Sequence, residues 1–353
     1  TYEQARRWSA TIAEVVKDER MPPWNADPKH GEFANDARLP ASERKRLLSW
    51  IEQGCPKGDI SDLPPARVFN DGWGLGKPDV VLKMPEKFTV PAEAPKGGIE
   101  YQHFVIPTNF DADVWVQAVE ARPDARAVVH HMLVYIGDKP GADERTSGDA
   151  DVLVSYVPGR TASVLPAGLA KRIPKGAKLT LQMHYTANGT EQIDQSSIAL
   201  VFSKEPPKHE IRVRFIANRT FAIPPKAANH GVSAETTFET DALLLSFSPH
   251  MHLRGKSFQF RAIYPDGRTE ILLNVPKYDF NWQHTYALKK ALHVPAGTRI
   301  ECVGQFDNSS ANPNNPNPLQ MVRWGDQSWE EMMLGSIGYL DLEQPVGRRA
   351  IAK

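Results

Sequence analysis

Five of the eleven histidines in this chain stand in three segments that have the composition of β-strands. His130 and His131 are adjacent in "AVVHHMLVYI", His184 follows "KLTLQM", and one residue separates His250 from His252 in "FSPHMHL". Imidazole is a common protein ligand for copper and zinc. Five imidazoles divide into three and two, so we expect two metal sites in one chain.

His250 and His252 fall on the polar face of their segment, because successive side chains of a strand point to opposite faces. The polar face consists of Ser246, Ser248, His250 and His252, and the apolar face of Leu245, Phe247, Pro249, Met251 and Leu253. The H-x-H spacing therefore places two imidazoles side by side, as a metal pair requires. The alternative is a pair of solvent-facing histidines on an exposed sheet.

His184 also falls on a polar face, opposite Leu181 and Met183, although a lone histidine in a strand is more often structural than a ligand. His130 and His131 break the alternation of faces. Both reach one metal only if a β-bulge turns them to the same side or if the strand ends there. The alternative is one buried histidine bonded to the backbone and one exposed histidine.

The pair His250 and His252 lacks a third ligand, and no cysteine is placed to supply one. The segment "SWEEMMLGSIGYLDL" offers the thioethers of Met332 and Met333. Most methionines fill hydrophobic cores, which is the alternative for both. A set of two histidines and one methionine favours copper, because thioether sulfur suits Cu(I), whereas zinc prefers imidazole, thiolate or carboxylate.

The scaffold predicted for these residues is all-β. Strand-like segments separated by turn residues continue from about residue 78, and the chain holds 29 prolines and 24 glycines. Its 353 residues suffice for two domains. We expect two jelly-roll-like antiparallel β-sandwich domains behind a small helical segment. The expected bounds are 1–62 for the helical segment, 63–204 for the sandwich with the three-histidine site, and 205–353 for the other sandwich.

Local signals predict single elements as well. Thr1 and Gln4 have the spacing of a capping box, which marks the start of a helix. The segment "ASERKRLLSWIEQG" predicts a second helix that stops at Gly54. The dipeptide Asn188-Gly189 predicts a β-hairpin.

Charge and cysteine content exclude several classes of function. The chain has 42 basic and 42 acidic residues, so no basic excess indicates nucleic acid as a partner. Its apolar runs are too short to predict a membrane span. Cys55 and Cys302 are its two cysteines, which excludes a disulfide framework and a zinc finger.

Four motifs, taken together, resemble the copper type II, ascorbate-dependent monooxygenases, a family that includes peptidylglycine α-hydroxylating and dopamine β-monooxygenases. The motifs are "HHM" (130–132), "LQMHY" (181–185), "HMH" (250–252) and "EM" (331–332), in that order. The resemblance covers about residues 78–345. It implies two mononuclear copper sites that face each other across an open cleft between two β domains.

The resemblance also implies a role for each site. His130, His131 and His184 would bind an electron-transfer copper that an external one-electron donor reduces. The catalytic copper, which binds O2 beside the substrate, would be held by His250, His252 and Met332. Met332 is favoured over Met333 because the family's methionine ligand directly follows an acidic residue. The reaction implied is hydroxylation of an activated C–H bond.

Two departures from the family concern the substrate. The arginine that holds the substrate carboxylate in peptidylglycine enzymes is replaced by Ser248, and a helping asparagine by Leu334. A C-terminal glycine peptide is therefore not the expected substrate. Because the disulfides of the animal enzymes are missing, the chain resembles a bacterial member, periplasmic or secreted.

The segment before the strands resembles the C-terminal part of a small c-type cytochrome domain, in which Met21 would be the axial haem ligand. The chain has no C-x-x-C-H motif, so no covalent haem is expected in it. An upstream haem-binding part, if the gene product has one, would be a natural electron donor. The alternative is a helical cap packed on the first sandwich.

We therefore expect a dicopper monooxygenase that acts on a small organic substrate with O2 and an ascorbate-like or cytochrome donor. A copper-binding or electron-transfer protein without hydroxylase activity is the first alternative. A β-sandwich binding module with incidental histidines is the second. Neither a nucleic-acid partner nor a membrane span is expected.

Overall fold

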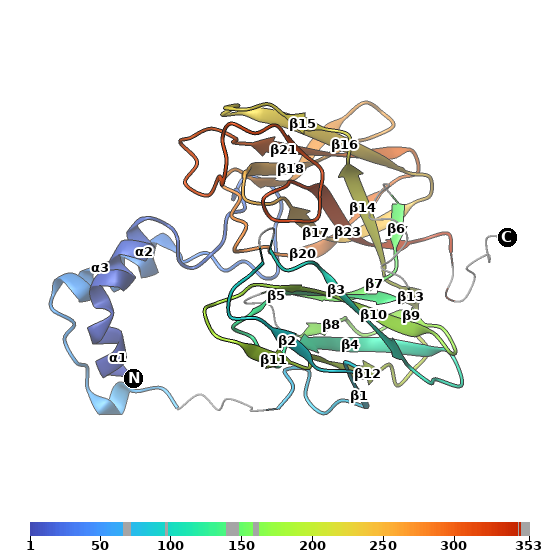
Figure 1. Ribbon diagram of the computed structural model, residues 1–353, viewed down its shortest axis with the longest axis horizontal. Coiled ribbons are helices and arrows are strands. Elements are labelled where there is room, and N and C mark those ends of the chain that lie inside the picture. The colour runs from blue at the N-terminus through green and yellow to red at the C-terminus, as the bar shows by residue number, and fades with distance from the viewer. Residues whose placement is uncertain (66–71, 96–97, 139–147, 158–161, 345, 347–353) are drawn as a thin grey trace.

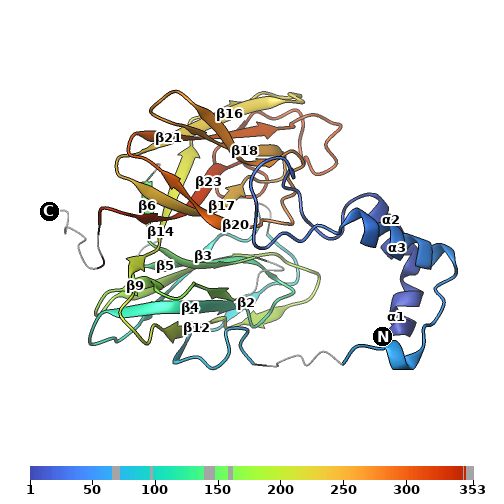
Figure 2. The same cartoon turned by 180° about the vertical axis from the view of Figure 1, so that it is seen from behind.

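The computed structural model describes residues 1–65, 72–95, 98–138, 148–157, 162–344 and 346. The molecule consists of two antiparallel β-sandwiches, one above the other, with three helices that project to one side (Figure 1). Figure 2 shows the same arrangement from behind. The prediction of an all-β fold with two sandwiches behind a helical segment is confirmed.

The helical segment comprises α1 (Tyr2–Arg7), α2 (Ser9–Lys17), α3 (Ala41–Glu52) and the 3₁₀ turn η1 (Ile60–Asp62). The predicted capping box at Thr1 and Gln4 is present at the start of α1. The second predicted helix is α3, and Gly54 follows its end with a φ of +82°, a conformation that glycine adopts without strain.

The helical segment is anchored to the second sandwich, so the alternative of a cap on the first sandwich is wrong. The three helices pack on one another and stand clear of both sandwiches in Figures 1 and 2. Trp24 and Phe33, which follow α2, enter the hydrophobic core of the second sandwich. The backbone N–H of Ala34 donates to Ala287, so this anchor includes a hydrogen bond to a strand edge.

The first sandwich holds one sheet in the order β1-β12-β4-β9-β13, with β8 beside β4, and a second in the order β3-β10-β5-β7. A small pair, β2 and β11, completes it. Its strands are β1 (Val80–Lys83), β2 (Phe88–Val90), β3 (Gln102–Pro107), β4 (Val114–Arg122), β5 (Val129–Ile136), β7 (Val152–Tyr156), β8 (Ser163–Val164), β9 (Leu169–Ile173), β10 (Lys178–Tyr185), β11 (Gln192–Asp194) and β12 (Ser197–Phe202). Its core includes Phe104, Met132, Leu181 and Leu200.

The second sandwich holds sheets in the orders β20-β17-β23-β14-β6 and β16-β21-β18-β19, with a small pair, β15 and β22. Its strands are β14 (Arg212–Asn218), β15 (Ala222–Ile223), β16 (His230–Phe238), β17 (Ala242–His250), β18 (Gly255–Ile263), β19 (Thr269–Val275), β20 (Tyr286–Val294), β21 (Thr298–Phe306), β22 (Val322–Arg323) and β23 (Met333–Asp341). Its core includes Phe247, Phe258, Phe260 and Ile300.

Two short strands cross between the sandwiches. β6 (Gly148–Ala150) precedes the boundary predicted at residues 204 and 205 but pairs with β14 of the second sandwich. β13 (His209–Glu210) follows that boundary but pairs in parallel with β9 of the first. A small apolar cluster that includes Tyr135, Phe215 and Leu334 lies where the two sandwiches meet. Backbone hydrogen bonds and apolar packing therefore both join them.

Two local predictions are wrong. Asn188-Gly189 does not close a hairpin: β10 pairs with β3 and β5, whereas β11 pairs with β2. Both edges of β10 are occupied, so the turn carries the chain to another sheet. Leu245 does not share the apolar face of β17, because a bulge between Leu244 and Ser246 shifts the register and puts Leu244 into the core instead.

Cys55 and Cys302 are both buried and free, in the helical segment and the second sandwich respectively. In the parts of the chain that the structure describes, no helix combines the length and apolar character that crossing a membrane requires.

Candidate metal centres

A β-bulge brings His130, His131 and His184 together. His184 on β10 pairs with His131 on β5, but the next residue, Tyr185, pairs with Val129. His130 is thus the extra residue of a β-bulge. Of the two arrangements that would let both adjacent histidines reach one metal, a bulge or a strand end, the chain has the bulge. His131 and His184 are buried, and His130 is half-buried. We call these three residues the first donor set.

The imidazoles of the first donor set converge. One ring nitrogen from each lies within 4.8 Å of those of the other two, and Nδ1 of His130 lies 3.4 Å from Nδ1 of His131. Nδ1 of His184 is buried and has no hydrogen-bond partner among the described residues. Because a buried polar atom without a partner is costly, this nitrogen fits a site that binds a metal ion.

Burial keeps the first donor set neutral. Desolvation lowers the pKa of His184 to about 3 and the pKa of His131 well below its usual range. It also lowers the pKa of His130. Neutral imidazole has a free lone pair, so all three side chains hold the form that a metal ion needs near neutral pH.

The second donor set consists of His250, His252 and Met332, and its two imidazoles are oriented by hydrogen bonds. His250, the last residue of β17, donates from Nδ1 to Oε1 of Gln283 over 2.6 Å. His252, in the turn that follows, donates from Nδ1 to the carbonyl of Glu330 over 3.3 Å. Both bonds assign the proton to Nδ1, so Nε2 is the nitrogen whose lone pair can bind a metal ion.

The imidazoles of the second donor set lie with their ring centroids 5.1 Å apart. Burial lowers the pKa of His250 to about 4 and that of His252 well below its usual range. This pair is therefore neutral near pH 7 as well. His250 is paired with Leu334 in the sheet, and both rings bond to residues of irregular connections.

Glu331 ties the histidine turn to the methionine segment. Its carboxylate accepts the backbone N–H of His252 over 2.8 Å and that of Arg254 over 2.6 Å. Glu331 is fully buried, and burial raises its pKa to about 8. Because Met332 is the next residue, these two bonds fix the thioether segment relative to both imidazoles. From the sequence, Glu331 was only the acidic residue that marks Met332.

The structure distinguishes the two adjacent methionines. Met333 is the first residue of β23 and lies in the hydrophobic core of the second sandwich. Met332 precedes the strand and lines a cavity that His250 also lines. The thioether of Met332 is thus the one on the side of the histidines, while Met333 fills the core.

Phe280 lies between the two donor sets. Its ring stacks on His130 with centroids 4.9 Å apart and an interplanar angle of 21°. Its edge meets His252 at 5.7 Å and 74°. The resemblance implies an open cleft between the sites, whereas here one aromatic ring touches both. Neither Phe280 nor Gln283 was found from the sequence, since both belong to the irregular connection between β19 and β20.

A cavity of about 580 Å³ lies beside the donor sets, between the two sandwiches. His131 of the first set and both His250 and Met332 of the second contribute to its wall. Its volume falls in the range of pockets that bind small molecules. The arrangement therefore combines two sets of neutral nitrogen or sulfur donors with room for an organic molecule beside them.

No family model and no curated protein matches the chain. Among solved structures, the major capsid protein P2 of bacteriophage PM2 is similar at a TM-score of 0.33 and 8% identity, over 77% of this chain and 99% of that one. Peptide:N-glycanase F is similar at a TM-score of 0.32 and 11% identity, over 76% of this chain and 97% of that one. Likenesses this weak indicate nothing about function.

Proposed function

We propose that this chain is a dicopper monooxygenase that hydroxylates an activated C–H bond of a small organic molecule. The observations that carry the proposal are that His130, His131 and His184 converge and that His131, His250 and Met332 line one interdomain cavity. The reductant is an external one-electron donor, ascorbate-like or a cytochrome. The proposed location is the periplasm or the exterior of a bacterial cell.

The donors fit copper in both sets. Three neutral imidazoles suit a copper ion that changes oxidation state without changing ligands. Two imidazoles and a thioether suit Cu(I), the state that reacts with O2, and disfavour zinc. Nδ1 of His184, which has no partner among the described residues, and the Nε2 lone pairs of His250 and His252 are consistent with bound metal.

Copper in the second donor set would supply O2 activation, and copper in the first would supply an electron. In the overall reaction one oxygen atom enters the C–H bond and the other leaves as water, with two electrons and two protons from outside the chain. The residues of the chain hold the imidazoles neutral, aim Nε2 of His250 and His252, and keep bulk water from the buried donors. No side-chain general base is required.

The alternative is a copper-binding or electron-transfer protein that lacks hydroxylase activity. It is favoured by the completeness of the first donor set, whose three imidazoles converge without any residue of the second. A binding module with incidental histidines would take up no stoichiometric copper. Copper analysis after loading and dialysis separates this last possibility from the other two.

The test compares one substitution at two adjacent positions. Met332→Ile should abolish oxygen consumption coupled to ascorbate while the copper of the first donor set stays reducible, because the thioether ligand is lost. Met333→Ile is the matched control: it changes the core, so it should lower thermal stability but retain coupled oxygen consumption. Full activity in Met332→Ile would contradict the ligand assignment.

A further inference from the structure

The interdomain cavity owes its space to small side chains on its floor. β17 and β23 lie side by side there, and Ser248 faces Ser336 while Ser246 faces Gly338. A Cβ on Gly338 would lie 2.5 Å from Oγ of Ser246, so a larger residue at this position would have to displace that hydroxyl. The cavity thus exists because β17 and β23 carry small residues where larger side chains would fill the space.

The opposite wall is mainly apolar, although Gln117, Ser155, Ser163, Lys171 and Gln182 also belong to it. It is formed by strands and connections of the first sandwich, and its members include Val116, Val119, Leu133, Val154 and Leu165. Leu245, which the bulge in β17 removes from the core, also lines the cavity. A ligand that fills this space therefore exchanges water for aliphatic contacts over most of its surface.

The polar side chains near the second donor set are uncharged: the amide of Gln283, which bonds to His250, and the hydroxyls of Ser248 and Thr285. Oγ of Ser248 lies 2.8 Å from Oγ1 of Thr285, and both residues line the cavity together with His250 and Met332. A hydroxyl that takes part in one such bond can still donate or accept another. The Ser248–Thr285 pair is therefore a hydrogen-bonding site for one neutral polar group beside the metal ligands.

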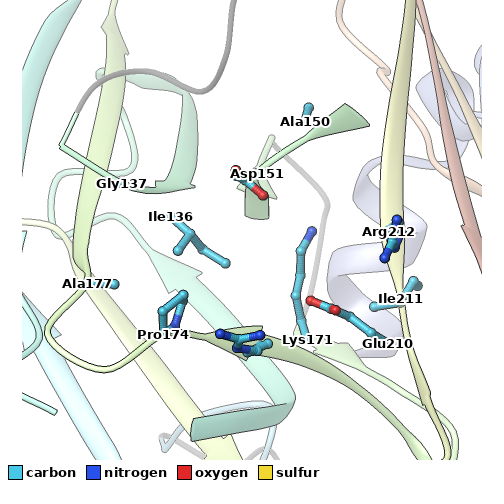
Figure 3. Close-up of a pocket in the computed structure, with 11 residues that line it drawn as sticks. Ile136, Gly137, Ala150, Asp151, Lys171, Pro174, Ala177, Glu210, Ile211 and Arg212 are labelled. Atoms are coloured by element: carbon cyan, nitrogen blue, oxygen red, sulfur yellow. The ribbon is translucent and has the colours of Figure 1, made fainter. Parts of the chain in front are cut away.

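Among the described residues that line this cavity there is no aspartate, glutamate or arginine. Lys171 lines it, but its Nζ donates to the carbonyl of Val152. Figure 3 shows Lys171 extending into a second, smaller cavity of about 200 Å³, which Asp151 and Glu210 also line. The ammonium group thus already donates to a backbone carbonyl.

We propose that the substrate is an uncharged, mainly apolar small molecule whose single polar group, a hydroxyl or carbonyl, bonds to the Ser248–Thr285 pair. This inference rests on the proposed function and narrows it to a substrate class. A carboxylate or ammonium group in this cavity would lose its hydration without gaining a charged partner among the described residues, which is costly. The apolar body of the substrate lies against the first sandwich.

The test uses three probes with one skeleton and three charges: phenylbutanol, phenylbutanoate and phenylbutylammonium. Binding to the full chain is measured by calorimetry, in the metal-free and the copper-loaded form. In the metal-free form, phenylbutanol should bind at least about tenfold more tightly than either ion. Bound copper would add a positive charge beside the cavity, so in the copper-loaded form the preference is expected only over phenylbutylammonium. Equal or tighter binding of either ion by the metal-free chain would overturn the proposed substrate class.

Two variants locate the bound alcohol. Ser248→Ala should weaken the binding of phenylbutanol about fivefold, because one hydrogen bond is lost, and Ser336→Phe should abolish it by filling the floor. Ser233→Ala, at an exposed position on β16, is the control and should change nothing. Thermal unfolding would verify that Ser248→Ala is folded. If this variant binds phenylbutanol as tightly as the parent, the alcohol binds elsewhere and the inference is overturned.

The outcomes separate this inference from the proposed function. Copper-dependent turnover of a charged substrate would support the monooxygenase and overturn the neutral substrate class. Selective binding of phenylbutanol by a chain that takes up no copper would support the preference of the cavity and overturn the monooxygenase.

Discussion

The first donor set is built by paired strands, whereas the second is assembled from a strand end, a turn and the segment before another strand. His131 and His184 face each other across β5 and β10, and the bulge at His130 adds the third imidazole. In the second set, Gln283, Glu330 and Glu331 hold the histidine segment through hydrogen bonds that the sheet does not supply.

This difference matches the roles proposed for the two sites. A set fixed by a β-ladder keeps its geometry when its charge changes, which suits electron transfer without ligand exchange. A set held by loops beside a cavity can admit other molecules, as binding of O2 and substrate requires. The contrast leads to three predictions, each of which tests whether the two sets are independent.

The largest effect is expected from His184→Ala. Loss of one of three imidazoles leaves the first donor set with two ligands, so copper bound after dialysis should fall from two ions per chain to one. His293→Ala, at an exposed histidine outside both sets, is the control and should retain two. Loss of both ions from a folded His184→Ala variant would show that the second set depends on the first.

A smaller effect, confined to the second donor set, is expected from Glu331→Gln. Glutamine offers one acceptor oxygen, so one of the two backbone N–H groups, of His252 or of Arg254, loses its partner. Copper affinity of the second set should fall about 10- to 100-fold, as measured by competition with a chelator, and the first set should be unchanged.

The matched control for this prediction is Glu330→Gln. Glu330 is adjacent, and its carbonyl, which the substitution keeps, is the group that bonds to His252. In Glu330→Gln the copper affinity of the second donor set should therefore stay within about threefold of the parent value. If both variants lose the same copper affinity at the second donor set, the effect comes from charge near the site and not from the hydrogen bonds that Glu331 makes.

The sequence predicted what depends on alternation along a strand. The polar faces that carry His184 and His250 follow from side-chain period. The bulge at His130 was only one of two arrangements, beside a strand end, that would let both adjacent histidines reach one metal. The faces were predictable because polar and apolar residues alternate along a single strand. This alternation can be recognised without knowing the partner strands. Leu245 was misplaced because a second bulge, in β17, leaves no mark in the sequence.

What depends on contacts between distant segments was not predictable. β6 and β13 have three and two residues, too few for a pattern, so the crossing of strands between the sandwiches could not be foreseen. Gln283 and Phe280 lie in an irregular connection. Polar and apolar residues have no regular spacing there, so the sequence does not indicate where their side chains point. The hairpin predicted at Asn188-Gly189 failed because the sequence does not show that both edges of β10 are already paired.

The smallest effect, and the sharpest test of independence, is expected from Phe280→Leu. The ring of Phe280 contacts His130 of the first set and His252 of the second, so its removal should weaken copper binding at both by about threefold, the scale of one aromatic contact. Phe221→Leu removes a ring that stacks on Phe306 in the core and is the matched control. It should lower the unfolding temperature without changing either affinity. A change at the first set alone would make Phe280 a cover for His130, and the two donor sets would then be separate sites that share a cavity.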